Sequence, residues 1–195
     1  MSTLIVTAHP DVDSLTLQAA RRLHDLLGPG EATLAHLAQE GFDPRFTTDD
    51  RRDYLAQSRT DAGIRAEQDR VDRADHLALV FPVYWWSMPA LLKGWIDRVF
   101  IGGWAFAVDG ERVVPRLERL TAHLLPVSGT AQESFERHGY AASFSTQIDH
   151  GIFDYCGIRR GATAFIRSSE SGDRGVVSRD LEAAATTVAA AITGR

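Results

Sequence analysis

The stretch Phe81-Pro82-Val83-Tyr84-Trp85-Trp86-Ser87-Met88-Pro89-Ala90-Leu91-Leu92-Lys93-Gly94-Trp95-Ile96-Asp97-Arg98-Val99-Phe100 says most about this chain. It follows the apolar run Leu77-Ala78-Leu79-Val80, which is typical of a buried strand. Trp85 and Trp86 are poor core residues, because each indole N–H needs a partner. Open α/β sheets bind ligands in loops at the carboxyl ends of parallel strands. The stretch therefore predicts a strand, a loop suited to a planar aromatic ligand, and a helix.

Outward from this stretch, apolar segments alternate with helical patterns. We expect strands at Leu4–Thr7, Ala32–Leu37, His76–Phe81, Leu120–Pro126 and Ala162–Arg167. We expect helices at Leu15–Leu26, Ala62–Ala74, Met88–Phe100, Ser143–Cys156 and Arg179–Ile192. The polar residues 38–61 are interpreted as a surface excursion, and residues 102–115 as a loop.

This alternation predicts an α/β domain over residues 1–195, with a parallel sheet covered by helices on both faces. The order of the strands is not readable from one sequence. If the order is 2-1-3-4-5, the first, third and fourth strands are neighbours. The loops 8–14, 82–88 and 127–131 then meet at one edge of the sheet.

Composition narrows the class of protein. Hydrophobic residues make up 44% of the chain, which indicates a globular protein, and the net charge of −5 argues against nucleic acid as a partner. The lone Cys156 has no partner for an internal disulfide, which fits a reducing compartment. The first apolar segment is too short for a signal peptide or a membrane span. We therefore expect a cytoplasmic protein.

The first of these loops, 8–14, precedes a predicted helix. Free N–H groups and the dipole of a helix N-terminus attract phosphate groups. Ser14 has a hydroxyl and His9 a ring N–H to donate. The alternative is that Ser14 only caps the helix and His9 is a solvated loop residue.

A rival interpretation starts from the same loop. Ala8-His9-Pro10-Asp11 resembles the start of the zinc motif in LmbE-like N-acetylglucosamine deacetylases, in which a His and an Asp bind zinc and a neighbouring Asp is the base. Here Val12 stands where the second acidic residue is expected. A clear His-x-x-His that would complete three protein ligands is also missing downstream. We therefore expect no metal.

A second resemblance covers nearly the whole chain. Its central segment is Pro82-Val83-Tyr84-Trp85-Trp86, continued by Pro89-Ala90-Leu91-Leu92-Lys93-Gly94-Trp95 and Arg98-Val99-Phe100. Leu4-Ile5-Val6-Thr7-Ala8-His9, Ser128-Gly129-Thr130 and Cys156-Gly157 support it. With these motifs the chain resembles the NAD(P)H:quinone oxidoreductase family of DT-diaphorase and the modulator-of-drug-activity proteins. The resemblance implies a flavodoxin-like fold.

The resemblance also implies a cofactor site. His9, Ser14 and the backbone of Leu15 match the flavin phosphate loop, and Pro82, Val83, Tyr84, Trp85 and Trp86 match the segment along the isoalloxazine ring. Ser128, Gly129 and Thr130 match the loop at the pyrimidine end, where Thr130 replaces a common second glycine. Asp97 and Arg179 match positions near the adenine half of FAD; for Asp97 the alternative is an ion pair with Lys93 or Arg98.

For catalysis, the resemblance points to His138, which matches a histidine that stabilises charge on the reduced flavin. A tyrosine assists that histidine in relatives; here the shorter loop offers only Phe135, with Tyr140 as a substitute. The alternative for His138 is a surface histidine. Trp104, Phe106 and Tyr155 match the substrate pocket, with Tyr155 expected from the second subunit of a homodimer; their alternative is core or dimer packing.

The implied activity is ping-pong hydride transfer, in which NAD(P)H reduces the flavin and a quinone or similar acceptor reoxidises it. The implied cofactor is FAD, with FMN as the alternative. Some relatives are ancillary subunits of potassium efflux systems, so a transport partner is the alternative role and the only link to a membrane.

Overall fold

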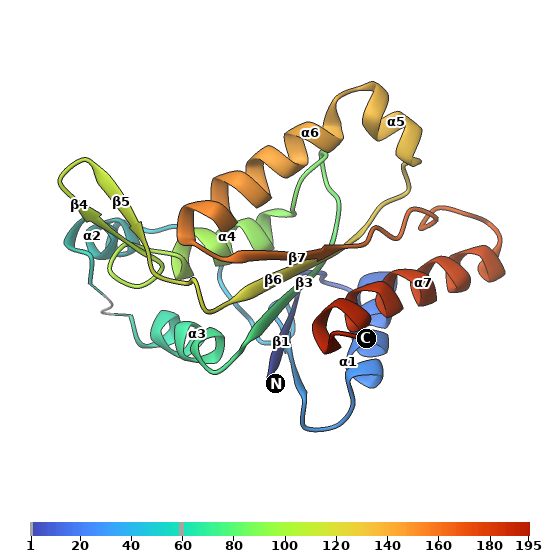
Figure 1. Cartoon of the computed structure of the whole chain (residues 1–195), viewed down its shortest axis with the longest axis horizontal. Coiled ribbons are helices and arrows are strands. Elements are labelled where there is room, and N and C mark those ends of the chain that lie inside the picture. The colour runs from blue at the N-terminus through green and yellow to red at the C-terminus, as the bar shows by residue number, and fades with distance from the viewer. Residues whose placement is uncertain (1, 59–60) are drawn as a thin grey trace.

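The chain folds around a five-stranded parallel sheet in this computed structural model, which describes residues 2–58 and 61–195 (Figure 1). Met1 and, within the predicted excursion, Arg59 and Thr60 lie outside the described residues. The strand order is β2-β1-β3-β6-β7, which is the 2-1-3-4-5 order of the flavodoxin-like fold. The strands are β1 (Thr3–Thr7), β2 (Ala32–His36), β3 (His76–Pro82), β6 (Thr121–Val127) and β7 (Arg159–Thr163).

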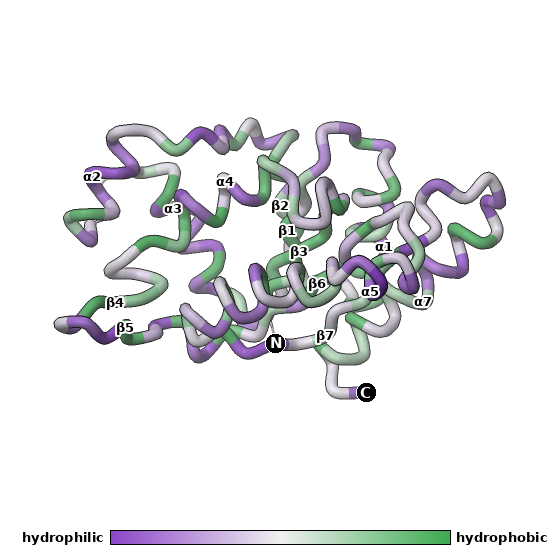
Figure 2. Tube along the Cα trace, turned by 90° about the horizontal axis from the view of Figure 1, so that it is seen from above, coloured by the Kyte–Doolittle hydropathy of each residue, from purple (hydrophilic) through white to green (hydrophobic). Residues whose placement is uncertain are grey.

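Helices cover both faces of this sheet, as predicted. Helices α1 (Leu15–Leu27) and α7 (Arg174–Thr193) pack on one face (Figure 1). The other face carries α3 (Ala62–Asp72), α4 (Ala90–Val99), and α6 (Tyr140–Ser145), which continues as the π-helix η1 (Thr146–Asp154). Neighbouring residues of a strand point to opposite faces, so Ile5 packs with α1 and α7 while Val6 packs on the other side. The central strands form the hydrophobic middle of the molecule (Figure 2).

Two segments that were predicted to lack regular structure contain a helix and a hairpin. Within the predicted excursion lies α2 (Thr48–Ala56), which begins at a capping box between Thr47 and Asp50. Within the predicted loop 102–115 lies an antiparallel hairpin of β4 (Phe106–Asp109) and β5 (Arg112–Pro115). Its two-residue turn contains Gly110 at φ 61°, a conformation that suits glycine.

The last third of the chain departs most from the prediction. The fifth strand covers Arg159–Thr163 and not Ala162–Arg167, because β7 pairs only with β6 and is an edge strand whose side chains are largely exposed. Helix α7 begins at Arg174, before the predicted start, and α6 begins at Tyr140, before the predicted Ser143. A short helix, α5 (Gln132–Arg137), was missed.

The strand order positions the candidate site. Because β1 is the direct neighbour of β3, and β3 of β6, the loops that follow these three strands lie side by side. No helix of the described residues combines the length and apolar character needed to cross a membrane.

Candidate functional site

A cavity of about 210 Å³ opens where the three loops meet. Eight residues predicted from the sequence line it: His9, Ser14, Leu15, Pro82, Val83, Tyr84, Ser128 and Gly129. Four others that line it were not predicted: Thr16, Val127, Ser169 and Glu170. Thr16 was detectable as a hydroxyl residue in the first turn of the predicted helix. Ser169 and Glu170 were missed because the loop after the fifth predicted strand, which ends at Arg167, was not counted among the loops that meet at the site.

Loop 8–14 is held by its own hydrogen bonds. The N–H of Asp11 donates to Nδ1 of His9 at 3.1 Å, so Nδ1 is an acceptor and a neutral ring carries its proton on Nε2. Ser14 is the N-cap of α1, and its Oγ accepts from the N–H of Leu17 at 3.3 Å. Both roles of Ser14 are compatible, because a hydroxyl that accepts one hydrogen bond still has its own proton to donate.

The first turn of α1 has backbone donors to spare. In the described part of the chain, the N–H groups of Leu15 and Thr16 have no acceptor, and both residues line the cavity. The helix dipole adds positive potential at this end. With Nε2–H of His9 and the hydroxyl of Ser14, the arrangement is suited to a phosphate group.

Loop 128–130 contributes one backbone donor. The N–H of Ser128 donates to the carbonyl of Ile166 at 2.7 Å, and that of Thr130 to Oγ of Ser128 at 3.1 Å. The N–H of Gly129 has no acceptor among the described residues. A Cβ added at Gly129 would lie 2.5 Å from the side chain of Glu170, which would have to move to make room for it. Thr130 does not line the cavity.

The two adjacent tryptophans form a tight turn beside the cavity. Tyr84 and Ser87 exchange backbone hydrogen bonds of 3.0 and 3.1 Å, and both central residues have positive φ, 48° at Trp85 and 66° at Trp86. Such a turn normally takes Asn or Gly, so this one is strained. Trp85 is 91% exposed, and neither indole lines the cavity.

An aromatic column joins this turn to His138. Trp86 stacks face to face on Tyr140 with ring centroids 3.8 Å apart, and His138 stacks on Tyr140 at 5.5 Å. His138 ends α5 and does not line the cavity. Phe135 packs edge-on against Trp86 at 5.7 Å, so the structure unites the residues that the sequence offered for a tyrosine–histidine pair.

Arg167 contacts both the aromatic residues around His138 and loop 128–130. Its guanidinium lies 4.1 Å from the ring centroid of Phe165 and 4.7 Å from that of Phe135, and it donates to the carbonyl of Thr130 at 3.3 Å. Burial lowers the pKa of Arg167, which nevertheless stays charged because arginine titrates far above neutral pH. Arg167 therefore links loop 128–130 to the aromatic column.

The two positions expected near an adenine group lie outside the cavity. Asp97 pairs with Lys93 at 2.6 Å, which is the alternative that the sequence left open. Arg179 lies on α7. A second cavity of about 660 Å³ runs between α1 and α7. It shares Leu15 and Ser169 with the first cavity, and Arg174 and Ser178 of α7 line it where Arg179 does not.

The three residues expected in a substrate pocket lie elsewhere in the fold. Trp104 is buried, at 7% exposure, and its indole N–H donates to Asp72, so it is a core residue of this chain. Phe106 and Tyr155 pack edge to face at 5.0 Å. The β4–β5 hairpin that carries Phe106 lies at the opposite end of the molecule from α5 in both views (Figures 1 and 2).

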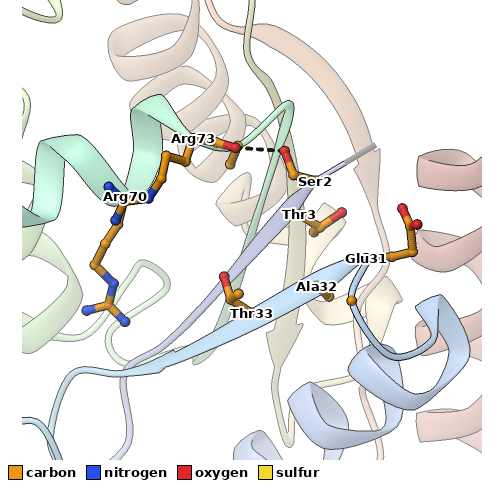
Figure 3. Close-up of a pocket in the computed structure, with 9 residues that line it drawn as sticks. Ser2, Thr3, Glu31, Ala32, Thr33, Arg70 and Arg73 are labelled. Carbon is orange, nitrogen blue, oxygen red and sulfur yellow. Dashed lines mark hydrogen bonds between the residues drawn. The ribbon is translucent and has the colours of Figure 1, made fainter.

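Other features of the chain are weaker candidates for a functional site. A cavity of about 350 Å³ at the amino-terminal edge of the sheet contains Arg70 and Arg73 (Figure 3), but Arg70 already pairs with Glu40 and Glu67. Burial raises the pKa of Cys156 to about 12, so its thiol is protonated and unreactive. Among the described residues, no group of three or more His, Cys, Asp or Glu side chains is placed to hold a metal ion.

Comparison with known proteins agrees with the flavodoxin-like strand order of the sheet. Residues 1–190 match a family described as Flavodoxin-like fold. An uncharacterized NAD(P)H oxidoreductase of Escherichia coli is 30% identical over 165 residues, which cover 83% of this chain and 81% of that protein. A ribosyldihydronicotinamide dehydrogenase [quinone] of Pongo abelii is 35% identical over 99 residues, but the match spans only 49% of this chain and 43% of that protein.

Solved structures with the same fold include two that are named as NAD(P)H- or NADH-dependent reductases. An NAD(P)H:quinone oxidoreductase from Methanothermobacter marburgensis superimposes with a TM-score of 0.85 at 24% identity, covering 95% of this chain and 96% of the other. An FMN-dependent NADH-azoreductase from Bacillus anthracis, in complex with FMN, gives 0.71 at 15% identity, covering 98% and 99%. At these identities the superpositions establish the fold.

Proposed function

The chain belongs to the family with the flavodoxin-like fold, and from this premise we propose that it is a flavin-dependent NAD(P)H oxidoreductase that reduces quinones or similar acceptors. Its resemblance to the NAD(P)H:quinone oxidoreductases is confirmed, since its relatives and structural neighbours include proteins named NAD(P)H oxidoreductase, quinone dehydrogenase and NAD(P)H:quinone oxidoreductase. A single domain over residues 1–195 and a cytoplasmic location are parts of the same proposal.

One observation carries the proposal: the unpaired donors of loop 8–14 and the first turn of α1 face the same cavity as Pro82–Tyr84 and Gly129. A flavin needs a phosphate site and a narrow slot for a planar ring. The phosphate site is supplied by His9, Ser14 and the N–H groups of Leu15 and Thr16. The N–H of Gly129 has no acceptor among the described residues and Gly129 lines the same cavity, so the residues present fit the cofactor.

The bound flavin supplies reversible hydride chemistry. The contribution of the chain is to bind, orient and stabilise. Loop 8–14 offers the phosphate uncharged hydrogen-bond donors, and Val83 and Tyr84 form one wall of the cavity. The N–H of Gly129 would be a donor toward negative charge on the ring, and His138, which Tyr140 and Trp86 connect to the 82–86 segment, is proposed as a second.

We favour FAD over FMN because the groove between α1 and α7 continues from the phosphate loop. The two cavities share Leu15 and Ser169, and the groove has a larger volume than the first cavity, about 660 Å³ against about 210 Å³. Arg174 and Ser178 in its lining are suited to the second phosphate and the ribose of an adenine nucleotide. FMN would leave this groove empty.

We also propose a homodimer. The β4–β5 hairpin, which carries Phe106, lies away from α5 (Figure 1), and Tyr155 packs against Phe106, so one chain alone does not bring this pair to the flavin. A second copy, related by a two-fold axis, would place them over the site of its partner. Sedimentation at micromolar concentration should give roughly twice the mass of one chain. A monomer with full quinone reductase activity would refute the shared pocket.

The phosphate site is tested by His9→Ala. This change removes one hydrogen bond to a charged group and should weaken the binding of FMN about tenfold, measured by quenching of flavin fluorescence. His24→Ala, near the other end of α1, is the matched control and should leave the affinity unchanged. Equal affinities of His9→Ala and the wild-type protein would remove His9 from the site.

A further inference from the structure

The cavity at the loop junction has an unusual charge. Among its described lining residues there is no Lys or Arg, and Glu170 is the one acidic side chain. The donors toward a phosphate are hydroxyl, imidazole and backbone groups. A ligand that carries negative charge would therefore enter a cavity whose formal charge is already negative.

Glu170 is placed there by the backbone. The N–H groups of Arg167 and Ser168 both donate to Asp180 of α7, at 2.7 and 3.0 Å, which anchors the loop after β7. The N–H of Ser169 donates to the carbonyl of Ser128 at 3.4 Å. Residue 170 is therefore held beside loop 128–130, whatever rotamer its side chain adopts.

The side chain of Glu170 extends over Gly129. A Cβ built at Gly129 would lie 2.5 Å from Cδ, 2.6 Å from Cγ and 2.8 Å from Oε1 of Glu170. The carboxylate makes no hydrogen bond or ion pair with any residue that the structure describes. Nearby, the guanidinium of Arg167 is turned toward Phe135, Phe165 and the carbonyl of Thr130. The charge of Glu170 is thus uncompensated at the cavity wall.

We propose that Glu170 is a specificity-determining residue of this cavity: its carboxylate opposes the negative charge of a bound flavin phosphate and limits how tightly the cofactor is held. The inference rests on the proposed flavin site. It adds to that site a residue that weakens the binding of the cofactor. Glu170 is exposed, so the repulsion between the two like charges is partly screened by solvent and depends on salt. The repulsion acts on charged flavins and spares riboflavin, which has the same ring and no phosphate.

The test compares two ligands in three proteins. Dissociation constants of FMN and riboflavin are measured by fluorescence quenching, at low ionic strength, for the wild-type protein stripped of cofactor, Glu170→Gln and Glu118→Gln. Glu118 is the matched control, because it is an exposed glutamate that contacts Gly157 and precedes the amino-terminal end of β6. Glu170→Gln should bind FMN roughly threefold more tightly, bind riboflavin as the wild type does, and lose its advantage in high salt.

Other outcomes overturn the inference. An unchanged FMN affinity would mean that the carboxylate faces solvent when the site is filled. Weaker FMN binding would make Glu170 a contact of the cofactor, and an equal gain for both ligands would make its effect steric. A wild-type protein that binds neither flavin would refute the proposed function itself, whereas flavin binding that Glu170→Gln does not alter refutes the role of Glu170 alone.

Discussion

Replacing His138 by alanine should slow reduction of the bound flavin by NADPH or NADH roughly 10²–10³-fold while leaving flavin affinity unchanged. The imidazole is proposed to stabilise negative charge that develops as the hydride arrives. Neutral imidazole donates one hydrogen bond, and imidazolium adds a positive charge. Affinity should persist because the phosphate loop around His9 and Ser14 is untouched.

The structure explains why a residue outside the cavity is a candidate. His138 stacks on Tyr140 at 5.5 Å, and Tyr140 lies 3.8 Å from Trp86 in a nearly parallel stack. Trp86 belongs to the turn that follows Tyr84, which lines the cavity. The column therefore connects the imidazole to the 82–86 segment through the rings of Tyr140 and Trp86.

Stopped-flow bleaching of the flavin at saturating nucleotide measures this rate without interference from binding. His150→Ala is the matched control, because His150 is exposed on η1 and pairs only with Asp154. If His138→Ala bleaches at the wild-type rate with both nucleotides, His138 is a surface histidine. The N–H of Gly129 would then be the remaining donor toward the ring, since the N–H of Thr130 already donates to Ser128.

Replacing Gly94 by alanine should destabilise the protein by roughly 3 kcal/mol, although alanine is the better helix former by about 1 kcal/mol. A Cβ at position 94 would lie 2.2 Å from the carbonyl oxygen of Pro44 and 2.7 Å from its Cα. These are backbone atoms. Arg98 fixes the segment by donating to the carbonyl of Asp43 at 2.8 Å and to the carboxylate of Asp50 at 2.9 Å, so it cannot move away without losing these bonds.

Thermal unfolding measures the effect, which should appear as a Tm lower by about 6–12 °C. Gly63→Ala is the control, because Gly63 is exposed in α3 and its new Cβ would meet only the side chain of Asp61, at 3.1 Å. That variant should be neutral or slightly more stable. A Gly94→Ala protein as stable as Gly63→Ala would show that the 38–47 segment adapts easily.

Gly94 also illustrates the limit of reading the sequence. The helical pattern around Gly94 predicted a helix despite the glycine. It did not reveal why a glycine stands at this position. That reason is a contact with Pro44, fifty positions away, inside a segment interpreted as a surface excursion. Packing of one segment's backbone on another leaves little periodic signal, so it was not predictable from the local sequence.

Other misses had readable signals. Thr47 followed by Asp50 is a capping box, which marks the start of α2. Gly110-Glu111, with Val108 before it and Val113-Val114 after it, is typical of a two-residue hairpin turn. Strand β7 had no such signal: as an edge strand it is basic and exposed at Arg159 and Arg160, whereas the apolar run after it was mistaken for the strand.

The candidate site was better predicted than the edges of the fold. Its loops follow buried parallel strands, whose apolar runs are unmistakable, and the strand order brings those loops together. The positions of Trp85 and Trp86 were not foreseen, because the strained turn that directs Trp85 to solvent depends on the stack of Trp86 against Tyr140. Glu170 was missed with the loop that carries it.

The central claim is that this chain binds a flavin at the junction of the three loops. The most direct test is the absorbance spectrum of the purified protein, followed by chromatography of the cofactor that denaturation releases. We predict a yellow protein with flavin absorbance bands, and FAD as the released compound. A colourless protein that also emerges free of flavin after incubation with FMN and FAD would contradict the account.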